Sequence, residues 1–336
     1  MNLPSTIYAF RWLLRDTFRQ ARFSGLFWLM LAVSALCVLV CFSVDVVGST
    51  PLRNQGEPTE FLPRSDPQAK PAVSGKSRVD VVSGDLTLAF GAFRVQLGRD
   101  GADAIRFLQL LLAGAVADTA GILLALIWTA GFLPSFLEAG AAVVLLAKPV
   151  PRGILLLGKF LGVLTFVGFQ ALVFVGGTWL ALGIRTGYWD LGYLLCIPLL
   201  LLHFAVFFSF SMWLAVYTRN TIVCVIGSLG FWFLCWGMNF ARHSVVAMPS
   251  LDPAVVMPAA LQSLVEAGYW ILPKPADMSM ILSHALHAET YFSTMPAFET
   301  VAKLGQFSPE FSVLSSVIFL AVLVFCAARQ LAHTDY

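Results

Sequence analysis

Six long runs almost free of charged residues constrain this chain more than any other feature. They lie at 24–44, 107–133, 160–184, 191–218, 220–241 and 311–328, and only the second contains a charge, at Asp118. Crossing the hydrocarbon core of a bilayer takes about 20 apolar residues in an α-helix. None of the runs alternates with the two-residue period of a strand, and within lipid a helix satisfies its own backbone groups. The sequence therefore predicts an all-α membrane protein with six transmembrane helices.

Composition excludes several other classes of protein. Of the 336 residues, 58% are hydrophobic and 12% are charged, whereas soluble domains are about half apolar and about a quarter charged. The spans use most of the chain, so too little remains for a soluble catalytic domain of ordinary size. The formal net charge of +2 gives no basic surface for nucleic acid.

The chain is predicted to form one transmembrane domain over residues 1–336. We place its spans at 24–47, 105–133, 153–184, 191–218, 220–241 and 311–330. Residues 1–23 are expected to form an amphipathic helix on the cytoplasmic membrane surface, because apolar residues recur at helical spacing beside four arginines. Residues 134–152 are expected to form a short cytoplasmic helix, called here the coupling segment. Two long external loops remain, at 48–104 and 242–310.

The distribution of Lys and Arg predicts which end of each span faces the cytoplasm. Cytoplasmic connections carry an excess of these residues, and long loops escape this rule. Basic residues gather on one side, at Arg11, Arg15, Arg19, Arg22, Lys148, Arg152, Lys159, Arg219 and Arg329. The one short connection on the other side has only Arg185. We therefore expect a multi-pass protein of the cell (inner) membrane with both termini in the cytoplasm.

The two external loops carry local patterns of their own. In the first loop, apolar residues alternate on both sides of Ser83-Gly84-Asp85, which predicts a small β-hairpin that turns there. In the second loop, helical patterns at 261–270 and 278–287 are separated by Pro273-Lys274-Pro275. We expect two helices lying over the outer ends of the spans.

Nothing in the sequence predicts a nucleotide, metal or disulfide site in this chain. Gly153 to Lys159 has the spacing of a phosphate-binding loop, but its interior is Ile and Leu and Phe160 replaces the required Ser or Thr. Met278, Met280, His284 and His287 lie close together but lack a cysteine or carboxylate to complete a metal site. All six cysteines fall inside spans, where they are expected to pack as small apolar residues.

Two titratable residues inside spans are candidates for an intramembrane function. Asp118 lies in the second span and His203 in the fourth. A carboxylate inside the bilayer is costly and usually faces protein or water, so Asp118 either contacts a proton or substrate or bonds to a neighbouring helix. The sequence indicates no Lys or Arg partner for either residue, and their two readings stay open.

The coupling segment has the features of a handle for a soluble partner. Pro134, Glu138 and Gly140 begin it, and Lys148-Pro149-Val150-Pro151-Arg152 closes it with a rigid turn before the third span, which starts with Gly158-Lys159. Charged residues at both ends of a short, stiff connection suit a partner that displaces a pair of membrane helices.

This pattern of proline, acidic residue, glycine, leucines, Lys-Pro-x-x-Arg and a later Gly-Lys resembles the permeases of ABC-2 type exporters, and is most similar to the nitrous-oxide-reductase maturation permeases. The resemblance implies the membrane half of an ATP-driven exporter, with its substrate unidentified and most simply a homodimer in the lipid bilayer. Separate ABC ATPase subunits would bind ATP and Mg, so this chain would hold no cofactor and catalyse no reaction. The ATPase-coupling residues implied are Glu138, Gly140, Lys148, Pro149, Arg152 and Lys159. Two alternatives stay open, a non-transporting membrane scaffold for an ATPase or assembly factor and a membrane-integral enzyme.

Overall fold

The computed structural model describes residues 3–47, 84–88, 93–97, 101–137, 151–251, 258–286 and 296–333. Six of its helical segments are long and apolar enough to span a membrane: Gly25–Phe42, Ile105–Phe136, Arg152–Thr186, Leu191–Thr218, Thr221–Leu251 and Pro309–His333. The predicted all-helical membrane fold with six spans is confirmed. The fifth span continues ten residues past the predicted end at Ala241, so its last three turns belong to what the sequence assigned to an external loop.

The spans are built from one or several helical elements. The first, fifth and sixth are single helices, α2 (Gly25–Phe42), α10 (Thr221–Leu251) and α14 (Pro309–His333). The second joins α3 (Gly101–Leu110), the π-helix η1 (Leu111–Gly121), α4 (Ile122–Thr129) and α5 (Phe132–Phe136). The third joins α7 (Arg152–Ala171), the π-helix η2 (Leu172–Gly176) and α8 (Gly177–Thr186), and the fourth joins η3 (Leu191–Leu195) to α9 (Cys196–Thr218).

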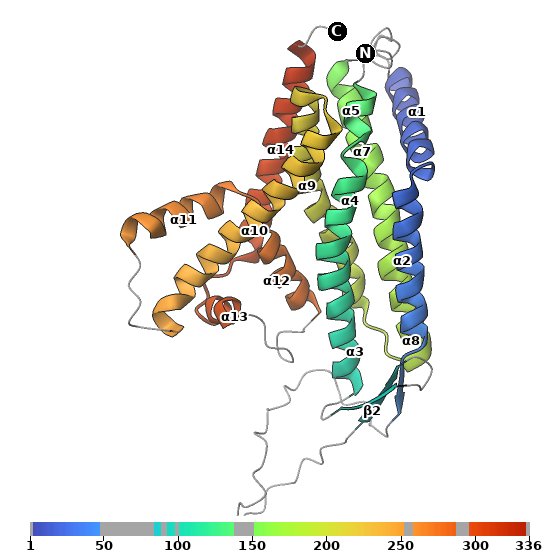
Figure 1. Ribbon diagram of the computed structural model, residues 1–336, viewed down its shortest axis with the longest axis vertical. Helices are drawn as coiled ribbons and strands as arrows, with labels where there is room; N and C mark the ends of the chain where they lie inside the picture. Colours follow the sequence, from blue (N-terminus) through green and yellow to red (C-terminus); the bar gives the residue numbers. More distant parts are fainter. Residues whose placement is uncertain are drawn as a thin grey trace, which may run out of the picture.

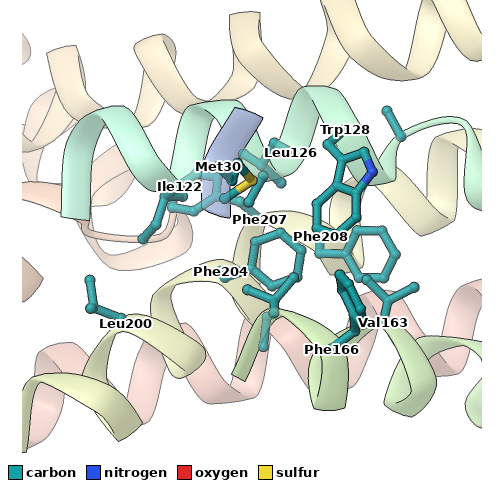
Figure 2. Packing of buried hydrophobic residues seen from close by; sticks show 14 of the residues in the cluster. Met30, Ile122, Leu126, Trp128, Val163, Phe166, Leu200, Phe204, Phe207 and Phe208 are labelled. Carbon is teal, nitrogen blue, oxygen red and sulfur yellow. The ribbon is translucent and has the colours of Figure 1, made fainter. Parts of the chain in front are cut away.

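The core of the bundle is made by aromatic and branched side chains from several spans. Phe160 stacks on Phe208 with ring centroids 5.5 Å apart, and Trp128 packs edge-on to Phe166 at 4.9 Å. Figure 2 shows Leu126 and Trp128 of α4 above Phe204, Phe207 and Phe208 of α9. Lipid is as apolar as these side chains, so this packing is held by close contact between the helices rather than by exclusion of water.

The N-terminal helix α1 (Leu3–Arg22) runs alongside the bundle instead of apart from it. Figure 1 shows α1 continuing the direction of α2, and it packs along α7. Leu13, Thr17 and Ala21 recur every four residues and are fully buried, while the arginines of the helix are exposed. The amphipathic pattern in the sequence is thus used to bury one face of α1 against α7.

Both ends of the chain lie at the same end of the bundle, which we call the terminal end (Figure 1). A small antiparallel sheet of β1 (Asp45–Val47), β2 (Gly84–Leu88) and β3 (Phe93–Leu97) lies at the opposite end, called here the sheet end. Gly84 and Asp85 belong to strand β2, where they pair with Leu97 and Gln96 of β3. The predicted hairpin with its turn at Ser83-Gly84-Asp85 is therefore not supported, because the strand begins where the turn was expected. Residue 83 itself lies outside the described residues.

Three helices follow α10 on one side of the bundle. α10 leaves the bundle at a slant, α11 (Ala259–Ile271) and α13 (Pro296–Lys303) pack on it, and α12 (Pro275–Ala285) turns back towards the spans (Figure 1). α12 contacts α10, α14, α9 and η1. Pro275 at the start of α12 suits a first helical turn, where the missing N–H has no intrahelical acceptor.

Candidate coupling site and buried polar pairs

Most of the predicted coupling segment falls outside the part of the chain that the structure describes. Glu138, Gly140, Lys148 and Pro149 lie in the range 138–150, for which no structure is described. The described flanks are α5, which ends at Phe136, and α7, which begins at Arg152. Both flanks lie at the terminal end of the bundle (Figure 1).

Lys159 of α7 joins the two flanks to the N-terminal helix. Its Nζ donates hydrogen bonds to Asp16 Oδ2 at 3.1 Å and to Gln20 Oε1 at 2.8 Å, and it lies 5.7 Å from the ring centre of Phe136. Gln20 in turn donates from Nε2 to Ser135 Oγ at 2.9 Å. The side chain of Lys159 is only 1% exposed. Its charge is therefore used inside the protein, and Lys159 does not present it to a docking surface.

Close packing surrounds this network. Gly162 lies one turn further along α7, and a Cβ placed there would be 2.9 Å from Thr17 Oγ1 of α1. The absence of a side chain at Gly162 lets the two helices approach closely, as small residues do between membrane helices. The other described coupling residue, Arg152, is half-buried and donates from Nη1 to the backbone carbonyl of Leu331 in α14 at 3.5 Å.

The two titratable residues predicted inside spans lie together in the structure. Asp118 Oδ1 of η1 is 2.6 Å from His203 Nδ1 of α9, and the side chains are 7% and 2% exposed. The sequence indicated no Lys or Arg partner for Asp118. Its partner is instead a histidine of a neighbouring helix, which is one of the two arrangements that the sequence left open. The contact joins residues 85 positions apart, so only the packing of the second span on the fourth creates it.

Comparison with known proteins identifies the family. A sequence profile of the ABC-2 family transporter proteins matches residues 11–331, nearly the whole chain. The chain belongs to the ABC-2 transporter family. The match is to the family as a whole, so the narrower likeness to the maturation permeases stays a prediction. A comparison with curated proteins found no match.

This ABC-2 protein also holds a buried polar cluster that the sequence analysis missed. Asp277 of α12 accepts hydrogen bonds from His243 Nε2 at 2.6 Å and Asn239 Nδ2 at 2.8 Å, both on α10. It also accepts from Tyr269 of α11 and from Ser312 of α14. The backbone N–H of Asp277 donates back to Asn239 Oδ1 at 3.0 Å. One fully buried carboxylate thus connects four helices.

Burial and neighbouring groups shift the pKa values of two residues in this cluster. Burial by itself would raise the pKa of Asp277, but the hydrogen bond and charge of His243, together with Ser312 and Tyr269, hold that pKa below its usual value. Lys274 lies in the turn before α12 and donates to Ser315 of α14, with its Nζ 4.6 Å from the ring centre of Tyr269. Burial, with a smaller contribution from Arg242, lowers the pKa of Lys274 to about 8. Arg242 packs on the same ring, with its Cζ 4.6 Å from the Tyr269 ring centre.

A signal for this cluster was present in the sequence but was not used. Asn239, Arg242 and His243 form a polar stretch at helical spacing after the last apolar turns of the fifth span. The span was predicted to end at Ala241, so Arg242 and His243 were assigned to a loop and Asn239 to the last turn of the span. Met278, Met280 and His284, which were considered for a metal site, lie on α12 within the described residues. His287 lies outside them.

Proposed function

We propose that this membrane permease component of an ABC transporter forms half of an exporter that separate ATPase subunits drive by binding at residues 138–152. The supporting observation is the Lys159 network. Lys159 contacts Phe136 near the start of the coupling segment, and it bonds to Asp16 and Gln20 of α1. A displacement of the segment would therefore be passed at once to α1 and to the second and third spans.

The arrangement of the chain favours a partner on the terminal end. Exposed arginines of α1 and the flanks of the coupling segment lie at the same end of the bundle (Figure 1). This end would face the cytoplasm of the cell, where ATP and Mg are bound by the partner. Two copies of the six-span chain, most simply a homodimer, would enclose the path of a substrate that stays unidentified. ATP-driven closure of the ATPase pair would shift the equilibrium between helix arrangements.

The test uses the full chain purified in lipid with the ABC ATPase that co-purifies with it. Charge reversal at Glu138 and at Arg152 is expected to reduce both complex formation and ATP hydrolysis by about tenfold or more, a loss of over 1 kcal/mol of binding. The matched control is Arg185→Glu, which changes an exposed arginine paired with Asp45 at the sheet end. Unchanged binding and hydrolysis in the Glu138 and Arg152 variants would show that the ATPase does not bind this segment.

A further inference from the structure

The two spans that the coupling segment joins share an unusual backbone. η1 occupies 11 residues of the second span and η2 occupies 5 residues of the third, and both are π-helical. In the described residues of the other four spans the helices are α, apart from the 3-10 turn η3. π-Helical stretches are rare and are found most often at functional sites. Here they lie in the pair of spans to which force on the coupling segment would pass first.

A π-helical stretch contains more residues per turn than an α-helix because its hydrogen bonds run from i to i+5 rather than i+4. If its hydrogen bonds change to the i to i+4 pattern, the stretch becomes α-helix and each turn contains fewer residues. Since an α-helix turns by about 100° per residue, the residues on one side then rotate by about that angle relative to the other side. A π stretch is thus a place where a span can change the direction of its side chains while keeping its backbone bonded.

The sequence of η1 supports the wider turn. Thr119 Oγ1 donates to the carbonyl of Gly114, five residues earlier, at 3.1 Å, which matches the spacing of the π backbone. Gly121 lies where a Cβ would be 3.1 Å from the carbonyl oxygen of Val116, also five residues earlier. At Gly114, by contrast, an added Cβ would meet no heavy atom within 4 Å. A side chain at Gly121 would therefore crowd the π-helical backbone, whereas one at Gly114 would not.

The Asp118–His203 pair lies within this stretch. Asp118 belongs to η1, and its partner belongs to α9, which is regular α-helix at that point. Among the described residues the buried Nε2 of His203 has no hydrogen-bond partner, and the contact of its Nδ1 to Asp118 is the polar interaction that they provide for this ring. Within an apolar span a polar group without a hydrogen-bond partner is costly, so the contact between the two side chains is favoured over their separation. The pair therefore favours the register of η1 that points Asp118 at α9.

We infer that the Asp118–His203 pair holds η1 in its π-helical register in the resting permease, and that the pair separates during each ATP-driven cycle as η1 changes register. Asp118 is thus a positioning residue for transport and not a contact for substrate. This inference rests on the proposed function, since it needs an ATPase that acts on the coupling segment.

The experiment tests whether residues 118 and 203 must separate for the cycle to proceed. The six native cysteines are replaced by alanine, and Cys is introduced in the double variant Asp118→Cys/His203→Cys, in which a covalent link takes the place of the native pair. The permease–ATPase complex in lipid is treated without nucleotide with a short bis-methanethiosulfonate crosslinker, and ATP hydrolysis is measured before crosslinking, after it, and after reduction of the link. The control is Phe210→Cys/Phe231→Cys, a pair from α9 and α10 whose rings stack at 4.0 Å away from either π stretch.

Crosslinking is expected to lower ATP hydrolysis by about fivefold or more for the 118–203 pair and by less than about twofold for the 210–231 pair, and reduction is expected to restore the rate. Unchanged hydrolysis after the 118–203 link forms, or an equal fall for both pairs, would overturn the inference. Failure of any ATPase to bind would instead contradict the proposed function.

A second measurement keeps all native cysteines and needs no crosslinker. Gly121→Ala disfavours the π register by its contact with Val116, whereas Gly114→Ala adds a methyl group into open space in the same stretch. Relative to wild type, Gly121→Ala is expected to change the basal ATP hydrolysis of the complex by about threefold or more, and Gly114→Ala by less than about twofold. Equal rates in the two variants would show that the register of η1 is not linked to the ATPase.

Discussion

His243 of α10 donates a 2.6 Å hydrogen bond to Asp277 of α12, and both side chains are completely shielded from solvent. The contact connects the end of the fifth span to a helix that packs on the fourth and sixth spans and on η1. Asp277 also accepts bonds from α11 and α14. Its carboxylate therefore helps to attach the helices beside the bundle to the spans.

Replacing Asp277 with alanine is expected to be strongly destabilising. The change leaves His243, Tyr269 and Asn239 without their acceptor in a buried site. Loss of one partner from a buried charged network costs about 3–5 kcal/mol. Thermal or denaturant unfolding of the purified chain measures this loss. The control is Glu299→Gln, since Glu299 and its partner Lys303 are 45% and 74% exposed and their pair is expected to contribute about 1 kcal/mol or less. Similar stabilities for the two variants would show that the Asp277 network does not attach α12.

Lys274 predicts a dependence of stability on pH. Its pKa is lowered to about 8 in the folded protein, chiefly by burial, whereas an unfolded lysine titrates near about 10.4. Between these values the unfolded chain binds more protons than the folded one, so the contribution of Lys274 to stability rises with pH from about 8 to about 10.4. Lys274→Met lacks this contribution. We expect the melting temperature of wild type to rise relative to that of Lys274→Met over this interval, and a constant difference would contradict the lowered pKa.

Replacing Asp16 is expected to cost more stability than replacing its partner Lys159. Lys159 is 1% exposed and Asp16 is 43% exposed. Asp16→Ala removes the charge partner of a buried cation, whereas Lys159→Met replaces the cation by an apolar side chain of similar volume and leaves Asp16 free to reach water. We therefore expect Asp16→Ala to lower the free energy of unfolding by about 1–3 kcal/mol and Lys159→Met to change it by less than that. Unfolding of both single variants and the double variant provides the measurement. The opposite order would show that Lys159 is solvated.

The contact of α1 with α7 predicts that two glycine-to-alanine substitutions in α7 change the stability of the protein in opposite directions. Gly162→Ala would place a methyl group 2.9 Å from Thr17 Oγ1, while at Gly168 the nearest atom, in Leu201, would be 3.6 Å away. Overpacking costs about 1–3 kcal/mol, and alanine in a helix is favoured over glycine by about 1 kcal/mol. Thermal unfolding is expected to show Gly162→Ala less stable than wild type and Gly168→Ala at least as stable.

Thr17→Ala supplies the check on this contact, because it removes the clashing hydroxyl. It is expected to recover most of the stability lost in Gly162→Ala when the two changes are combined. No recovery would mean that the cost of Gly162→Ala arises elsewhere than against α1.

The candidate site was predictable only where the signal is local. The Pro-, Lys- and Arg-containing pattern at 134–159 and the length of the match to ABC-2 transporters both follow from linear sequence. The placement of Lys159 did not follow from it. A lysine beside a predicted cytoplasmic turn is most simply exposed, and its burial depends on Asp16 and Gln20, which lie 143 and 139 positions away.

The sequence by itself determined the membrane class of this protein and the approximate position of its six spans, because the need of a helix to match about 30 Å of hydrocarbon is met by neighbouring residues alone. The tertiary structure decided which polar groups meet inside it. Asp118 with His203 and Asp277 with His243 are each brought together by helices that are distant along the chain. A buried polar group is stable only beside a partner, and the identity of that partner depends on which helices pack together and on the register of each.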